Sequence, residues 1–252
     1  GQKEWLQSGR VPRDYPGPVA ADYPDCLGIV REKVYPQRLA QHDAGGKRYW
    51  WRYLRPRPEM HEAIAPLRRV LVRSRVGNLH SVTFVAKDMV YSEATVVFAS
   101  GDAADLAILQ CSLHESWVRA QTSTLKGDTR YSPTDCFENY PFPQLDVVRR
   151  ESIRSIGEAY HEHRRQLMLA RQEGLTATYN RFHNPAETAG DIARLRALHV
   201  EMDQAVAAAY GWQDLDLGHG FYDTPQGLRY TISPAARMRC AAPSTIWDIP
   251  GR

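Results

Sequence analysis

The periodicity of the apolar residues changes at Pro143, and this change constrains the fold more than any other feature of the sequence. Before it, β-branched and aromatic residues gather in short runs separated by turn residues, which predicts an antiparallel meander over 70–74, 81–85 and 90–98. After it, apolar residues recur at spacings of three and four, which predicts two long amphipathic helices packed as an antiparallel pair. We therefore expect an α+β protein: a small mixed, mainly antiparallel sheet with packed helices, followed by a helical domain.

These patterns divide the chain into four expected segments. Residues 1–24 are rich in Pro, Gly and Asp and show no periodicity, as in an extended connector. The sheet and its helices are expected over 25–145, with one helix from Pro58 and another from Asp102 whose stripe includes Leu106 and Trp117. The helical domain is expected over 146–237, and residues 238–252 have no helical periodicity and are expected to be disordered.

Bulk composition favours an ordinary globular protein. The chain has 252 residues, 43% of them hydrophobic and 24% charged. Its four cysteines are far apart, so neither a disulfide framework nor a zinc site is predicted. No apolar run is long enough for a membrane span, so we expect a reduced, cytoplasmic protein without a membrane partner.

A basic stretch lies within this nearly neutral chain. Between Arg31 and Arg75 there are twelve Lys and Arg residues against four Asp and Glu residues. A solvated surface could have the same composition. The aromatic residues of the segment 49–53 are interleaved with these charges, however, and this combination favours a nucleic-acid partner.

The segment from Leu125 to Pro143 carries the most suggestive chemistry. It brings Lys126, Asp128, Thr129 and Arg130 within five positions and ends on a proline-stiffened aromatic run at 139–143. Short polar side chains beside basic ones can contact base edges and phosphates together. The prolines restrict the backbone on the carboxyl side of this segment.

Two arginines at the end of the first expected strand form a second candidate. Alternation along a strand places Arg73 and Arg75 on the same face. Such a pair can hold a phosphate or read a guanine, although it could equally be an ordinary exposed face.

No catalytic or metal-binding constellation is recognisable. No lysine follows an acidic residue at the spacing of the common metal-nuclease element, and the one Gly-x-Gly, at 218–220, follows no strand. On a helix His161 and His163 point apart, so they are expected to be surface histidines, and Cys136 is expected to be a packed thiol. Asn184-Pro185 lacks the aromatic residue that would stack on a flipped base.

Several dispersed blocks resemble the MmeI-type restriction–modification proteins and their stand-alone DNA methyltransferase relatives. They occur in a consistent order, at 69–75, 92–98, 109–117, 130–143, 157–160, 174–183 and 209–212. This resemblance implies that the chain is a target recognition domain followed by a C-terminal helical domain. It also implies a parent enzyme that transfers a methyl group from S-adenosylmethionine to adenine N6, with or without cleavage. The cofactor and its methyltransferase domain are expected outside this chain, with double-stranded DNA as the partner.

The residue patterns and the resemblance together suggest roles for particular residues. Base readout is expected from the segment before the Pro-Phe-Pro run and from the arginine pair, that is Lys126, Asp128, Thr129, Arg130, Arg73 and Arg75. Contacts to the DNA backbone are expected from Lys47, Arg48, Arg52, Arg55, Arg57 and Ser123. No residue of this chain is expected to be catalytic or to bind a metal.

The C-terminal end departs from the family pattern. Relatives continue into a Leu-rich helix after Arg237, whereas this chain does not, so a truncated or frame-shifted end is expected. The helical pair could instead make the chain a protein-interaction module that docks a methyltransferase or restriction subunit. An independent enzyme is the weakest alternative because no site supports it.

Overall fold

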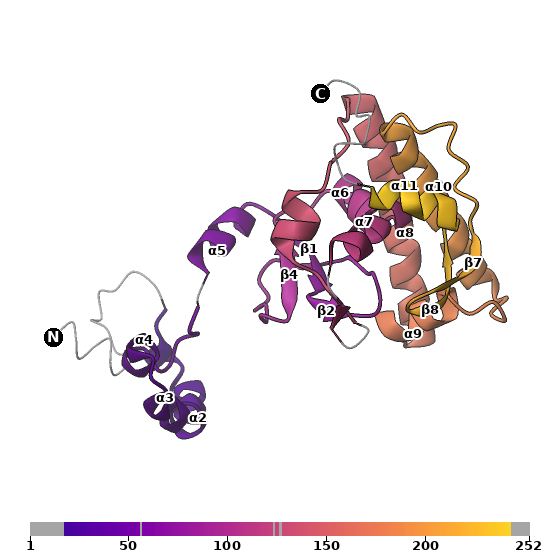
Figure 1. Cartoon of the computed structure of the whole chain (residues 1–252). Coiled ribbons are helices and arrows are strands. Elements are labelled where there is room, and N and C mark those ends of the chain that lie inside the picture. The colour runs from indigo at the N-terminus through magenta and orange to yellow at the C-terminus, as the bar shows by residue number, and fades with distance from the viewer. Residues whose placement is uncertain (1–17, 56, 123, 126–127, 243–252) are drawn as a thin grey trace. The chain divides into compact units, whose positions relative to one another are not determined.

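The computed structural model describes residues 18–55, 57–122, 124–125 and 128–242 (Figure 1). It divides the chain into two compact units, 1–62 and 63–252. The division falls within helix α5 (Pro58–Ile64), whose start at Pro58 agrees with the prediction. The α+β class is confirmed. The units differ from the expected segments, because one hydrophobic core includes residues from both sides of position 145.

The first unit is a set of short helices. The 3-10 turn η1 (Ala20–Asp22) precedes helices α2 (Pro24–Lys33), α3 (Tyr35–Ala40) and α4 (Ala44–Arg48). The extended connector predicted over 1–24 is therefore wrong for the described part from residue 18, because Asp22 closes a turn and Pro24 occupies the first position of α2. Residues 1–17 lie outside the described part of the chain.

The second unit opens with a three-stranded antiparallel sheet of order β3-β1-β4, formed by β3 (Thr83–Ala86), β1 (Arg69–Ser74) and β4 (Thr95–Phe98). The strands and their antiparallel pairing are confirmed, but the meander is wrong: the first strand is central. Val70 and Leu71 of β1 are fully buried, and the central position lets the backbone of this buried strand form hydrogen bonds along both edges.

A second small sheet has the order β2-β6-β5, formed by β2 (Val76–Gly77), β6 (Asp128–Arg130) and β5 (Thr124–Leu125). The π-helical turn η2 (Thr134–Glu138) follows it. Strands β7 (Gly220–Thr224) and β8 (Gly227–Thr231) form a separate antiparallel hairpin. Gly227 has a φ of +93°, a backbone conformation that is strained for any residue with a side chain, so this turn depends on glycine.

The helix expected from Asp102 is interrupted. Asp102 caps α6 (Ala103–Gln110) as predicted, but Cys111 is extended, with ψ 158°, and a new helix α7 (Ser112–Gln121) begins after it. The Cys111 thiol accepts from the His114 amide and thereby caps α7. Because of this break, α6 and α7 are two separate helices, and both are largely buried. The single apolar stripe in the sequence does not predict the break.

The two long helices are confirmed as α8 (Val147–Arg171) and α10 (Gly190–Ala209), with the short α9 (Leu175–Phe182) between them. They run antiparallel, because Arg171 at the end of α8 pairs with Asp191 at the start of α10, while Tyr160 packs on His199 further along. His199 is buried between the helices.

Helix α8 also packs closely on α6, so the helical segment is not separate from the sheet. A Cβ atom added at Gly157 of α8 would lie 2.1 Å from the Ala103 carbonyl oxygen. Arg69 of β1 donates two hydrogen bonds to Glu158 of the same helix. These contacts join residues on both sides of the boundary expected at 145.

We predict that Gly157→Leu will lower the free energy of unfolding by about 3 kcal/mol, because the side chain must displace the backbone of α6. Urea unfolding measures this change. Gly190→Ala is the control, since nothing lies within 4 Å of its Cβ position, and its stability should be unchanged or slightly raised. Equal stabilities of the two variants would contradict the close packing of α8 on α6.

Part of the expected tail is ordered. Helix α11 (Pro234–Ala241) begins at the cap Ser233, and Cys240 within it is fully buried. The disorder predicted from 238 is therefore wrong for Met238–Ala242, because Ala236 and Cys240 anchor the helix in the core. Residues 243–252 lie outside the described part. No helix in the described residues is long and apolar enough to cross a membrane.

Candidate nucleic-acid interface

The second sheet presents the polar segment that the sequence singles out. Strand β6 lies between β2 and β5, with Arg130 opposite Val76 and Asp128 opposite Leu125. Alternation places Asp128 and Arg130 on one face of the strand. The Arg130 side chain is exposed and that of Asp128 is half-buried, so both can be reached by a ligand. Lys126 and Ser123 lie outside the described residues.

Thr129 faces the opposite way and is not available for base readout. It is 5% exposed, and its hydroxyl accepts a hydrogen bond of 3.1 Å from Arg119 of α7. Arg119 also donates to the Asn78 carbonyl oxygen beyond β2 and to Glu115. The predicted contact of Thr129 with bases is therefore wrong: the residue fixes β6 to the helix behind it.

Arg73 is likewise structural. Its side chain is 4% exposed, and the guanidinium lies 4.1 Å from the centroid of the Tyr131 ring. It donates to His80 Nδ1 at 3.1 Å and to the Ser74 carbonyl oxygen. Burial lowers the pKa of Arg73 to about 10. The predicted role of Arg73 in readout is wrong, because alternation identifies its face but not the Tyr131 ring that covers it.

Arg75 occupies the junction between the two sheets. Its amide donates to the Ala94 carbonyl oxygen, and its own carbonyl oxygen accepts from the Tyr131 amide that follows β6. The side chain is half-buried. Arg75 is thus brought beside β6.

The aromatic run after β6 holds this strand in place. Tyr131 and Tyr140 are buried, and both pack edge-on against the ring of His114 in α7. Phe142 packs on Tyr140. The rigid exit predicted from the prolines is therefore built by aromatic packing as well, and Cys136 is buried among these residues as a packed thiol.

The basic residues of the first unit form an exposed surface of their own. Its described members Lys47, Arg48, Arg52, Arg55 and Arg57 are all exposed. Arg48 and Arg52 lie over the Tyr49 ring at 5.4 and 5.6 Å. The interleaved aromatic residues thus have two roles. Trp50 is buried against Tyr35, whereas the Tyr49 ring packs against the guanidinium groups of Arg48 and Arg52.

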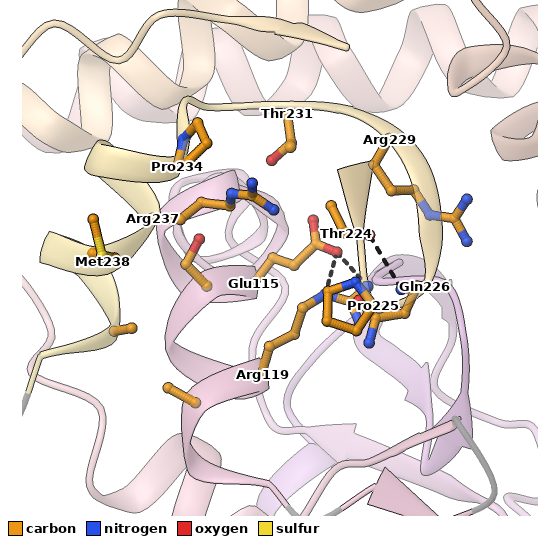
Figure 2. Close-up of a pocket in the computed structure, with 13 residues that line it drawn as sticks. Glu115, Arg119, Thr224, Pro225, Gln226, Arg229, Thr231, Pro234, Arg237 and Met238 are labelled. Atoms are coloured by element: carbon orange, nitrogen blue, oxygen red, sulfur yellow. Dashed lines mark hydrogen bonds and ion pairs between the residues drawn. The ribbon is translucent and has the colours of Figure 1, made fainter. Parts of the chain in front are cut away.

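A pocket that the sequence does not indicate lies in the second unit (Figure 2). It has a volume of about 430 Å³ and is enclosed by α7, the β7–β8 hairpin and α11. Its walls come from residues more than a hundred positions apart, so no local motif could have revealed it. Among the described residues, no three His, Cys, Asp or Glu side chains are arranged to hold a metal ion.

Comparison with known proteins assigns the polar segment to a family. Residues 51–144 match the model of the MmeI target recognition domain. A DNA methyltransferase A of Bacillus subtilis (strain 168) is 31% identical over 125 residues, which make up 49% of this chain and 13% of that protein.

A solved structure of the Type IIL restriction-modification enzyme MmeI in complex with DNA has the same fold. The TM-score is 0.63 with 16% sequence identity, over 97% of this chain and 30% of that one. The chain thus spans well under half the length of either relative. The part of the chain that is similar to the MmeI target recognition domain, residues 51–144, contains β6 and its neighbours.

Proposed function

We propose that this chain recognises a sequence of double-stranded DNA on behalf of a larger DNA adenine methyltransferase. The observation that carries the proposal is the presentation of Asp128 and Arg130 on one face of β6, fixed from behind by the hydrogen bond between Thr129 and Arg119. A carboxylate accepts from a cytosine amino group and a guanidinium donates to guanine, so the two side chains can discriminate base pairs.

The methyl transfer itself is proposed for a domain outside these residues. Such a domain would bind S-adenosylmethionine and methylate adenine N6, while this chain holds the duplex in register. The similarity to a DNA methyltransferase supports this assignment of the parent protein. The exposed basic residues at 47–57 would contact phosphates, and a nuclease domain in the parent is compatible with the same role.

The alternative of a protein-interaction module loses its main support. It required the apolar faces of the two long helices to be free for a partner. The apolar residues of α10, however, are buried within the second unit, namely Ile192, Leu195, Met202 and Val206. This apolar face therefore packs inside the protein.

We predict that Arg130→Ala will weaken binding to the preferred duplex by about 5- to 150-fold and relax the choice of base at one position. A randomised-duplex selection with the whole chain, followed by titration at fixed salt, measures both effects. Arg55→Ala should weaken all duplexes alike. Arg194→Ala is the control, since its side chain is exposed and pairs only with Glu201 among the described residues. A selection that yields no preferred sequence would contradict base readout.

A further inference from the structure

The pocket between α7, the β7–β8 hairpin and α11 has an excess of positive charge. Its walls carry Arg119, Arg229 and Arg237 but a single carboxylate, Glu115. Arg119 donates to the Glu115 carboxylate at 2.6 and 2.9 Å, so the negative charge of Glu115 is paired with Arg119. Two guanidinium groups therefore remain without a carboxylate in the described walls of the pocket.

Neither of these two arginines is tied into the fold by an acidic partner. Arg229 donates only to the adjacent Leu228 carbonyl oxygen, and its Nε is buried without a hydrogen-bond partner in the described structure. Burial and the nearby charge of Arg119 lower the pKa of Arg229. Arg237 lies 6.0 Å from the Tyr222 ring centroid and reaches from α11 toward Glu115 (Figure 2). Such uncompensated cations favour an anionic ligand.

The rest of the lining suits a sugar–phosphate group. Pro225 and Met238 contribute apolar surface on opposite sides of the pocket (Figure 2). A deoxyribose can pack on the apolar walls while its phosphate accepts hydrogen bonds from guanidinium groups. The volume of about 430 Å³ accommodates a group of this size.

The pocket adjoins the readout strand. Arg119 forms part of its wall and also bonds to Thr129 in β6, the residue between Asp128 and Arg130. The pocket therefore lies on the Thr129 side of β6, next to the strand whose opposite face carries Asp128 and Arg130.

We propose that Arg229 and Arg237 bind a backbone phosphate of the recognised duplex, with the adjacent sugar in the pocket. This inference rests on the proposed function and extends the DNA interface to the β7–β8 hairpin and α11, beyond the residues 51–144 of the family domain. The contact positions the duplex and carries no sequence information.

The test compares the whole chain with the double variant Arg229→Gln, Arg237→Gln. We expect the variant to bind every duplex about tenfold more weakly while selecting the same sequence. The slope of log affinity against log salt should fall by about one, the value expected for one phosphate. The double variant Arg165→Gln, Arg194→Gln is the matched control, because it also removes two charges, each from an exposed ion pair. Unchanged unfolding midpoints exclude a folding defect.

Neutral methylphosphonate substitution, one phosphate at a time, identifies the contact directly. One position should weaken binding by the unaltered chain about tenfold and have no further effect on the double variant. A double variant with unaltered affinity and salt slope would overturn the phosphate site, while a preferred sequence in the selection would leave base readout standing. If the unaltered chain selected no preferred sequence, the proposed base readout would be wrong. The difference in salt slope between the unaltered chain and the double variant would still test the phosphate site.

Discussion

Lowering the pH from 7 to 4.5 is expected to reduce the free energy of unfolding by on the order of 3 kcal/mol, because several histidines are held neutral by the fold. His80 Nδ1 accepts from Arg73 while its Nε2 donates to the Leu109 carbonyl oxygen. His183 Nδ1 accepts from the Tyr230 amide. Protonation of either ring would oppose two donors across a hydrogen bond.

The direction of the pKa changes agrees with this geometry. Burial, and then the charge of Arg73, holds the pKa of His80 well below its ordinary value. Burial also lowers the pKa of His114 and His183 to about 4. The unfolded chain, with histidine pKa values near 6.5, binds more protons at acidic pH. The stabilisation is complete above about pH 6.5 and is lost as the pH falls toward 4.

Urea unfolding at several pH values measures this dependence. His183→Gln should make it shallower, since the glutamine oxygen can accept from the Tyr230 amide without titrating. His163→Gln is the control, because the glutamine amide can make the same donation to the Asp191 carbonyl oxygen as His163 Nε2. A free energy of unfolding that is constant between pH 7 and 4.5 would refute the neutral histidines.

Replacing Asp203 by Ala is expected to lower the free energy of unfolding by about 3–5 kcal/mol, the usual cost of breaking a buried charged network. The carboxylate is fully buried and accepts from the Ser112 amide and from His219 Nε2, both at 2.8 Å. Although burial opposes ionisation, His199 and His219 keep the pKa of Asp203 below its ordinary range. Its loss leaves buried donors unsatisfied at the start of α7.

The same measurement on Glu201→Ala is the matched control, since this exposed carboxylate on α10 pairs only with Arg194 among the described residues. A loss of about 0.5 kcal/mol or less is expected there. Asp203→Asn should fall between the two, because the amide keeps an acceptor but lacks the charge. A cost below 1 kcal/mol for Asp203→Ala would show that the network does not hold α7.

The sequence predicts the candidate interface only in part, and the reason is physical. Alternation along a strand states which side chains share a face, and Asp128 and Arg130 both lie within β6, where it applies. Arg75, in contrast, lies in a bend after the end of β1, so its grouping with Arg73 stays a prediction. Alternation does not state which face is covered. Tyr131 and His80 enclose Arg73, and Arg119 captures Thr129, through contacts between segments that are distant in sequence.

Local periodicity by itself determined the α+β class, the antiparallel strands, the two long helices and the cap at Asp102, because each depends on neighbouring residues. Only the tertiary structure decided the central place of β1, the break at Cys111 and the packing of α8 on α6, since these depend on contacts across the fold. The pocket with Arg229 and Arg237 belongs to the second group. Its charge excess exists only where α7, the hairpin and α11 meet.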